Sequence, residues 1–395
     1  MKSNPTNLTS RTLATAAVAL SLCAATAFSG EAAAEPDDRL SEEQAAALRH
    51  AIFVEIADGE RQQREAEMAA RSIEIDGFTM RWLERTFGDP PESGRSLWLS
   101  LHGGGNAPAQ LNDSQWRNQI RLYKPEEGIV IAPRAPTNDW NLWHQPHIDT
   151  LFTRLIENAI VVHGVNPDRV FLLGYSAGGD GVYQLAPRIP DRFAAAAMMA
   201  GHPNDADLIS VRNLPFAILM GGDDSAFNRN TVAAEKSQRL KTLQQEDPQG
   251  YTHLSRIYPG LPHWMDGRDA EALPWMADFS RNPWPDRVVW RHSRVPHQRF
   301  YWLQLPGNHT PEPGQTLIAT VAGNQIHLEG DVPEGLQILL ADELLDLDQP
   351  VEIIVNDAPH SVHQPRRCEE VIRQSLLNRL DPAITPVAKI TVSRD

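Results

Sequence analysis

A serine stands between two glycines in the segment Gly174-Tyr175-Ser176-Ala177-Gly178, directly after the apolar run "RVFLL". Small residues in a G-x-S-x-G pattern let a strand turn sharply into a helix and expose the serine oxygen. A serine hydroxyl attacks efficiently when an imidazole takes its proton, a carboxylate orients that imidazole and donors stabilise the developing oxyanion. The pattern therefore predicts nucleophilic chemistry at Ser176, and a serine that merely caps a helix is the alternative.

The acid and the base that such a serine needs follow it in the chain. Asp224 comes three residues after Gly221 in "GGDDSAFNRN", beyond the strand-like "PFAILM", and its neighbour Asp223 is the alternative acid. His263 lies in the loop-like "YPGLPHWMDG" after the last major strand-like segment. The chain order serine, acid, histidine is the order that hydrolases with a G-x-S-x-G elbow use. We therefore expect Ser176, Asp224 and His263 to act together.

Donors for an oxyanion are expected from a glycine-rich segment, "LSLHGGGNAP". Glycines let backbone N–H groups approach a substrate carbonyl without obstruction, so we assign Gly104, Gly105 and the N–H of Ala177 to this role. A phosphate-binding loop is the alternative, but no lysine and hydroxyl follow at the required offsets.

Four further side chains are candidates for the substrate site. Trp140 and Trp143 follow the strand-like "GIVIAP", at the edge of a sheet where pockets open, and are expected to form an apolar wall unless they pack internally. His102 and Tyr175 flank the glycine-rich segment and the nucleophile, and we expect both to contact substrate.

Other polar residues have a weaker claim to function. His144 and His147 are three residues apart, but no further ligands complete a zinc pattern, and the pair His360 and His363 is weaker still. We therefore expect neither a metal nor another cofactor. Asp180 falls in the first helical turn after the nucleophile, where a negative charge is favoured by the helix dipole.

The elements that must position these residues alternate between strand and helix. Strand-like segments are "SLWLSL", "GIVIAP", "RVFLLGY", "FAAAAMMAG", "PFAILMGG" and "HLSRIYPG", and helical patterns separate most of them. Such alternation predicts an α/β fold with a mostly parallel sheet covered by helices on both faces. Before it, "RSIEIDG" and "FTMRWLERTFG" predict an edge hairpin with its turn at Asp76-Gly77.

Composition divides the chain into four parts. We expect a signal peptide at 1–34, a helical leader at 35–70, a catalytic domain at 71–282 and a small β-rich domain at 283–395. The last boundary follows the two prolines of "RNPWPDR". Beyond it come "RVVWRH", "RFYWLQL", "TLIATVAG", "NQIHLEG", "VEIIVND", a helical "RCEEVIRQSLLNRL" and "AKITVSR".

The N-terminus predicts export. Lys2 and Arg11 precede an apolar stretch, 13–28, that is shorter than the roughly 20 residues of a membrane span. We therefore expect a secreted or periplasmic protein without a membrane span, with lipidation at Cys23 as an alternative. After signal removal Cys368 is the one remaining cysteine, so no disulfide is expected within the chain.

The net charge limits the partners. A formal charge of −15 argues against nucleic acid or an anionic membrane surface, because both would repel the chain.

In their order, "LHGGGN", "GYSAGG", "GGDD" and "PHW" resemble the motifs of the α/β-hydrolase superfamily across about residues 70–280. Within it the chain resembles secreted bacterial esterases of the poly(3-hydroxybutyrate) depolymerase-like, feruloyl esterase-like and predicted-peptidase group. The resemblance implies an eight-stranded sheet, a Ser176-Asp224-His263 triad and cleavage of carboxylic esters through an acyl-enzyme. A serine peptidase and a catalytically silent binding module are the alternatives. The segment "DSAFNR" departs from the group, in which many members carry a Val-Pro pair there.

Overall fold

The computed structural model describes residues 39–393. The expected signal peptide at 1–34 and the first four residues of the expected leader lie outside the described residues. Within 39–393, no helix is both long enough and apolar enough to cross a membrane.

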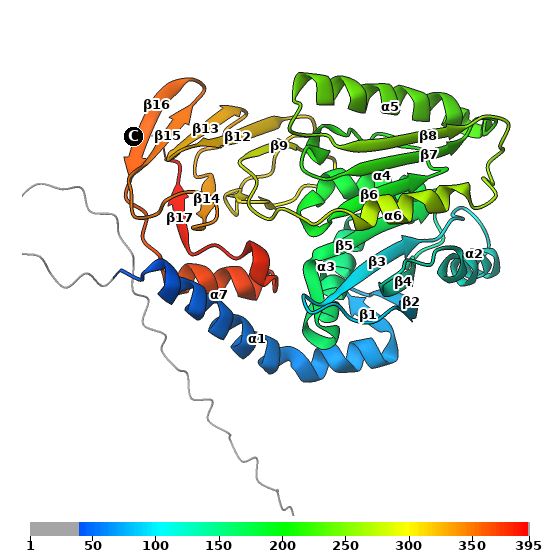
Figure 1. The fold of residues 1–395 in the computed structure, drawn as a ribbon, viewed down its shortest axis with the longest axis horizontal. Coiled ribbons are helices and arrows are strands. Elements are labelled where there is room, and N and C mark those ends of the chain that lie inside the picture. Colours follow the sequence, from blue (N-terminus) through cyan, green and yellow to red (C-terminus); the bar gives the residue numbers. More distant parts are fainter. Residues whose placement is uncertain (1–38, 394–395) are drawn as a thin grey trace, which may run out of the picture. The chain divides into compact units, whose positions relative to one another are not determined.

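An eight-stranded sheet with the order β1-β2-β4-β3-β5-β6-β7-β8 carries the functional segments (Figure 1). The pairings from β4 through β8 are all parallel, and β1 and β2 are joined to this edge by antiparallel pairing. The strands are β1 (Ser72–Ile75), β2 (Phe78–Phe87), β3 (Arg95–Leu101), β4 (Gly128–Arg134), β5 (Val165–Tyr175), β6 (Ala195–Met199), β7 (Phe216–Gly221) and β8 (His253–Tyr258).

Helices cover both faces of this sheet. Every residue of β4, β6 and β7 is buried, which requires cover on both sides because successive side chains point to opposite faces. The helices are α2 (Ala109–Leu122), α3 (Pro146–His163), α4 (Ala177–Arg188), α5 (Arg229–Glu246) and α6 (Ala272–Ala277). Short 3-10 helices are η1 (Pro190–Arg192), η2 (Ile209–Val211), η3 (Ala226–Asn228) and η4 (Arg268–Glu271). The predicted mostly parallel α/β architecture, that of the α/β hydrolases, is confirmed.

The edge hairpin formed by β1 and β2 is also confirmed. Ile75 pairs with Phe78, and the two turn residues between them, Asp76 and Gly77, have φ values of 52° and 79°. Two successive left-handed residues form the type I′ turn that matches the twist of a hairpin, and Asp-Gly is a preferred pair there.

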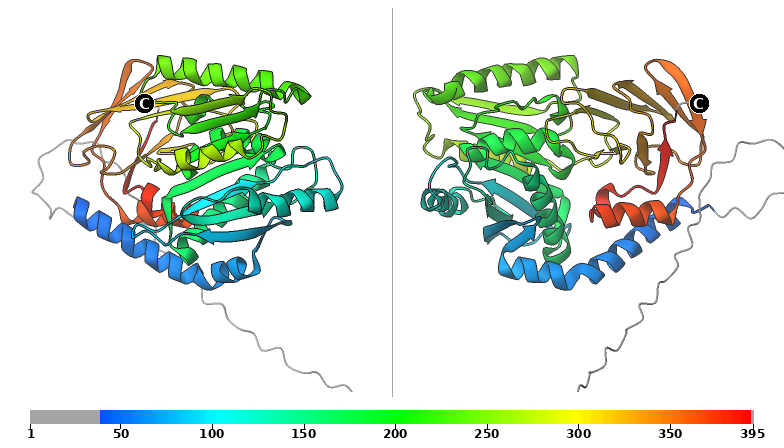
Figure 2. Two further views of the ribbon diagram at one scale, coloured as in Figure 1. Left: turned by 45° about the vertical axis from the view of Figure 1, so that its right-hand side comes forward. Right: turned by 180° about the vertical axis from the view of Figure 1, so that it is seen from behind.

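A long helix, α1 (Glu42–Ala70), precedes the hairpin. It starts with a capping box, in which the Ser41 side chain accepts from the N–H of Gln44 and the Gln44 side chain accepts from the N–H of Ser41. Ile52 packs into the core of the C-terminal region, whereas Met68 packs into the core of the eight-stranded sheet. The helix therefore contributes to both hydrophobic cores, and Figure 2 shows it beside α3 and α7.

Two smaller sheets form the C-terminal region. Their strand orders are β10-β11-β14-β17 and β16-β15-β13-β12-β9. The elements are β9 (Arg287–Arg291), β10 (Arg299–Phe300), β11 (Leu303–Gln304), β12 (Thr316–Ala322), β13 (Gln325–Gly330), β14 (Gln337–Leu340), β15 (Val351–Val355), β16 (Ala358–His363), α7 (Glu369–Asn378), η5 (Pro382–Ile384) and β17 (Ala388–Thr391).

The sequence interpretation of this region needs three corrections. "RFYWLQL" is not one strand, because Tyr301 adopts φ 51° and folds the segment into the tight pair β10 and β11. Strands β14 and β16 were not anticipated. Strand β14 pairs with β11 and β17, which are distant in sequence. Strand β16 pairs with its neighbour β15 across the turn Asn356-Asp357, but none of its side chains is buried, so no alternation of apolar residues marked it.

Candidate active site

Ser176 occupies the sharp turn between β5 and α4. Its backbone has φ 58° and ψ −123°, a conformation that a residue with a side chain adopts only under constraint. The neighbouring glycines make the turn possible: a Cβ at Gly174 would lie 2.2 Å from the Gly178 oxygen, and a Cβ at Gly178 would lie 2.1 Å from the Leu101 oxygen. Both glycines of the G-x-S-x-G pattern are therefore required by close backbone packing.

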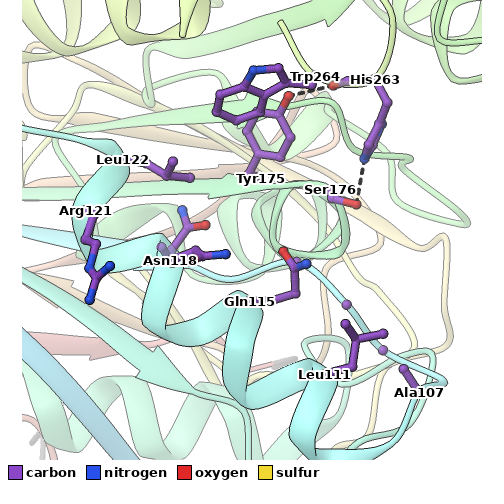
Figure 3. A pocket seen from close by; sticks show the side chains of 14 residues that line it. Ala107, Leu111, Gln115, Asn118, Arg121, Leu122, Tyr175, Ser176, His263 and Trp264 are labelled. Atoms are coloured by element: carbon purple, nitrogen blue, oxygen red, sulfur yellow. Dashed lines mark hydrogen bonds between the residues drawn. The ribbon is translucent and has the colours of Figure 1, made fainter. Parts of the chain in front are cut away.

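Three side chains from separate segments form a continuous hydrogen-bonded chain. Ser176 Oγ lies 3.0 Å from His263 Nε2, and His263 Nδ1 lies 2.6 Å from Asp224 Oδ2 (Figure 3 shows the serine–histidine contact). Because a carboxylate accepts hydrogen bonds, Nδ1 carries the ring proton and Nε2 accepts from the serine hydroxyl. This is the arrangement in which an imidazole acts as the base toward a serine.

The acid loop distinguishes the two adjacent aspartates. Asp224 is buried, whereas Asp223 is exposed. Gly221 lets the two loops meet, because a Cβ there would lie 2.1 Å from the Pro262 oxygen in the His263 loop. The structure thus brings Asp224, and not Asp223, to the imidazole.

The unusual "DSAFNR" segment continues from this aspartate. Phe227 and Asn228 are both left-handed, with φ values of 55° and 57°. This pair turns Phe227 outward, so its side chain is 78% exposed and lies under the guanidinium of Arg229 at 4.9 Å. An Arg229 nitrogen also lies 3.7 Å from Asp224 Oδ1 and adds positive charge beside the buried carboxylate.

Tyr175 has a different position from the one expected. Its ring lines the pocket, but its hydroxyl donates to the backbone oxygen of His263 at 2.5 Å and accepts from the N–H of Met265 at 3.2 Å (Figure 3). Burial is the main cause that raises the pKa of this phenol well above its ordinary value. The Tyr175 hydroxyl therefore binds the backbone of the two residues that flank Trp264, and so holds the histidine loop in place.

The glycine-rich segment passes directly beside the nucleophile. A Cβ at Gly103 would lie 3.1 Å from Ser176 Cβ. Among residues 39–393, the N–H groups of Gly104 and Ala177 have no protein acceptor. The N–H of Gly105, in contrast, donates to Asn112 Oδ1 at 2.8 Å. The assignment of Gly105 as an oxyanion donor is therefore wrong, because Asn112 of α2 already accepts from this N–H.

Two residues expected to contact substrate are internal supports. His102 is fully buried, and its Nδ1 lies 2.6 Å from the Gly103 oxygen while its Nε2 accepts from the N–H of Ala135. Burial lowers the pKa of His102 to about 4, so the ring is neutral at pH 7. Trp143 is also fully buried, and its indole N–H donates to the His102 oxygen at 2.9 Å. Both side chains brace the glycine-rich loop from within.

A pocket of about 560 Å³ opens at Ser176 and His263. Its lining includes one face of α2 and Trp264, which sequence reasoning did not identify. Trp140 is exposed but is not among the lining residues, and its ring meets His144 edge-on at 5.4 Å. In the sequence, only the position of Trp264 directly after His263 could have indicated that it lines the pocket.

The remaining polar candidates have partners within the fold. The His147 ring stacks on Phe78 at 3.7 Å, whereas the His144 ring meets Trp140 edge-on, so the two rings face different neighbours. Asp180 accepts from the N–H of His202 at 2.6 Å, and burial raises its pKa.

Parts of the chain are similar in sequence to proteins named as esterases. No family model matches the chain. It is 30% identical over 146 residues to NocK of Nocardia uniformis subsp. tsuyamanensis, a protein named as an esterase. The matched segment covers 35% of this chain and 42% of that protein. It is 28% identical over 140 residues to the bifunctional acetylxylan esterase/xylanase XynS20E of Neocallimastix patriciarum, covering 34% of this chain and 20% of that protein. The chain thus spans less than half the length of either relative.

Solved structures of low identity are also similar. LpqC, a poly(3-hydroxybutyrate) depolymerase from Bordetella parapertussis, matches with a TM-score of 0.37 and 17% identity over 52% of this chain and 93% of that one. The strand order and the elbow at Ser176 identify the fold independently of this likeness. The chain has the α/β-hydrolase fold and is similar to proteins named as esterases.

Proposed function

We propose that this chain is a carboxylic ester hydrolase in which Ser176, His263 and Asp224 form the catalytic triad. The hydrogen-bonded chain from Asp224 through His263 to Ser176, at the mouth of an open pocket, is the observation that supports this most strongly. The esterase names of the similar proteins agree with it.

The reaction proceeds in two half-reactions. Ser176 Oγ attacks the ester carbonyl carbon while His263 Nε2 takes the hydroxyl proton, and Asp224 stabilises the imidazolium. The carbonyl oxygen becomes an oxyanion that accepts from the N–H groups of Gly104 and Ala177. Collapse of this intermediate breaks the bond to the alcohol oxygen, which receives the proton from His263. Water then attacks the acyl-enzyme with the same base, and the released acid restores Ser176.

Labelling with a fluorophosphonate tests the nucleophile directly. The wild-type chain should be labelled at Ser176 and should hydrolyse 4-nitrophenyl acetate, and Ser176→Ala should lose both properties, with a fall in kcat on the order of a millionfold. Ser114→Ala, which changes an exposed hydroxyl on α2, serves as the control and should retain both.

The alternatives give different results in the same assay. A silent binding module would be neither labelled nor active, and this outcome would end the hydrolase proposal. A serine peptidase would be labelled but would cleave aminoacyl amides with a higher kcat/KM than matched esters.

We also propose a secreted or periplasmic location, which rests on the charged and apolar pattern of residues 1–34. Sequencing the N-terminus of the protein recovered from the exporting cell would test it. An N-terminus near residue 35 is expected, and an intact Met1 on cytoplasmic protein would contradict export.

A further inference from the structure

One side of the pocket is formed by a stripe of residues on α2. Leu111, Gln115, Asn118 and Leu122 all line the pocket. Their spacing of four, three and four residues places them on one face of a helix. In Figure 3 this face follows the pocket from the glycine-rich loop to the region below Trp264. The stripe therefore extends the pocket away from Ser176 as an arm, defined by Gln115, Asn118, Leu122 and Trp264.

The polar groups in this arm are not used by the fold. Among the described residues, the amides of Gln115 and Asn118 have no hydrogen-bond partner, although both side chains line the pocket. Opposite them, the indole of Trp264 is 48% exposed. Free amides beside an exposed aromatic surface suit a polar, extended group better than a simple alkyl chain.

An exposed arginine lies beside the far end of the arm. Arg121 is among the lining residues, and in Figure 3 it leaves the end of α2 away from Ser176 with its guanidinium directed away from Leu122 and Trp264, so binding a group in the arm requires this exposed side chain to turn toward Trp264. No described acidic side chain lies within 4.0 Å of Arg121. It is the one lysine or arginine among the lining residues of a chain whose formal charge is −15. Such a chain repels anions in general, so a local cation in its pocket changes which substrates can approach.

We propose that this arm selects esters that carry a carboxylate on the half of the molecule lying along α2, with Arg121 as the anion-binding residue. This inference rests on the proposed ester hydrolysis at Ser176. Gln115 and Arg121 are six positions apart, which corresponds to roughly 9 Å along the helix axis. A guanidinium can bind a carboxylate through two parallel hydrogen bonds.

A simpler role for Arg121 makes a different prediction. A cation in the last turn of α2 is favoured by the helix dipole whatever the substrate is. That role stabilises the helix and leaves the preference between charged and neutral esters unaffected. Substrate pairs that differ only in charge therefore separate the two roles.

The test compares a terminal carboxylate with its neutral carboxamide. The first series consists of 4-nitrophenyl esters of dicarboxylic acids and of their half-amides, with increasing chain length. The second consists of acetate esters of ω-hydroxy acids and of the corresponding amides, which place the charge on the alcohol half. The measured quantity is the ratio of kcat/KM for acid over amide in the wild type, R121Q, R121K and R117Q.

We expect the wild type to prefer the acid by roughly three- to tenfold at one chain length in one series, the range of a partly exposed charge-assisted pair. R121Q should reverse the ratio, because the acidic chain then repels the charged ester, and R121K should be intermediate. R117Q removes an exposed arginine of the same helix that does not line the pocket, so it should keep the wild-type ratio. Added salt should reduce the wild-type preference.

Three results would overturn the inference. A wild-type ratio at or below one at every length in both series would do so, as would equal loss in R117Q and R121Q, or an unchanged ratio in R121Q. In each case hydrolysis of the carboxamide esters would show that the proposed hydrolase activity stands. Absence of hydrolysis and of fluorophosphonate labelling would reject both proposals together.

Discussion

Asp223 and Asp224 are neighbours in the chain, but Asp224 alone reaches the imidazole ring. The turn after β7 buries the Asp224 carboxylate against His263 Nδ1 and leaves Asp223 at the surface. Two chemically identical side chains thus receive different roles from backbone direction alone.

The first prediction concerns this pair. Asp224→Asn should lower kcat by about 10⁴-fold, because an amide in this place favours the wrong tautomer of His263. Asp223→Asn should change kcat little, since the exposed carboxylate has no contact with the imidazole. Steady-state kinetics on both folded variants would measure this, and the opposite ranking would transfer the role of the acid to Asp223.

Tyr175 shows a second effect at the residue scale, because its hydroxyl connects the elbow strand to the histidine loop. Tyr175→Phe should lower kcat by roughly tenfold to a hundredfold with little change in KM, since displacing a reacting group by about 1 Å has effects of this size. The rate of fluorophosphonate labelling should fall in the same proportion.

Tyr258→Phe is the matched control for this residue. The Tyr258 hydroxyl donates to the Arg268 oxygen at 3.0 Å, beyond the histidine in the same loop. Both variants should lose similar thermal stability, but only Tyr175→Phe should lose kcat. An equal loss of kcat in the two variants would assign Tyr175 a merely structural role.

At the scale of elements, the loop between β3 and α2 is held on both sides. His102 and Trp143 brace it from the core, and Asn112 of α2 binds the N–H of Gly105 and, through its side-chain amide, the oxygen of Ala107. The loop is therefore fixed before substrate arrives, which is what an oxyanion site requires because its donors must not reorganise during the reaction.

A single methyl group should disturb this loop. Gly104 has φ 112°, and a Cβ there would lie 2.3 Å from Asn112 Oδ1, so Gly104→Ala must displace either the loop or the Asn112 side chain that holds it. We expect kcat to fall on the order of 10²- to 10³-fold, as when an oxyanion donor is lost. Gly77→Ala is the control, since Gly77 also has a positive φ but nothing lies within 4 Å of the added Cβ. Wild-type kcat in Gly104→Ala would remove this loop from the oxyanion site.

At the scale of the whole described molecule, buried charges join the C-terminal region to the larger sheet. Arg281 is 2% exposed on its side chain and binds Asp168 at 2.8 Å and Asp381 at 2.7 Å, and it also donates to the Asp191 oxygen. Burial acts to lower the pKa of Arg281, but the two carboxylates reverse this and raise it. Trp284 nearby is buried as well. The two-proline segment is therefore not an exposed linker.

Removing one member of this network should be costly. Arg281→Ala leaves Asp381 buried without its main partner, so we expect a loss of about 3–5 kcal/mol in the free energy of unfolding. Urea denaturation measures the loss, and limited proteolysis should cut near residues 281–287 in this variant but not in the wild type. Arg294→Ala, which breaks an ion pair with Asp205 at the surface, should change neither property. Rapid cleavage of the wild type at 281–287 would contradict this account.

Local sequence determined much of the candidate site. The glycines around Ser176 specify a turn that few other residues permit, and the β1–β2 turn at Asp76-Gly77 follows from the same kind of backbone preference. The strand–helix alternation placed Asp224 and His263 at the edge of the sheet where Ser176 lies, because parallel strands share their carboxyl ends. These features depend on short segments, so the sequence alone predicted them.

Tertiary structure decided which groups face the pocket and which support it. The Tyr175 hydroxyl meets a residue 88 positions away, and the burial of His102 and Trp143 depends on helices packed over β3. The wall formed by α2 could not be predicted from the sequence either. A helix face that carries Gln115 and Asn118 beside leucines resembles an ordinary solvent-exposed face, and only the folded chain places the pocket against it. Hydrogen bonds and burial across long separations depend on the assembled core, and residue type at one position carries little information about them.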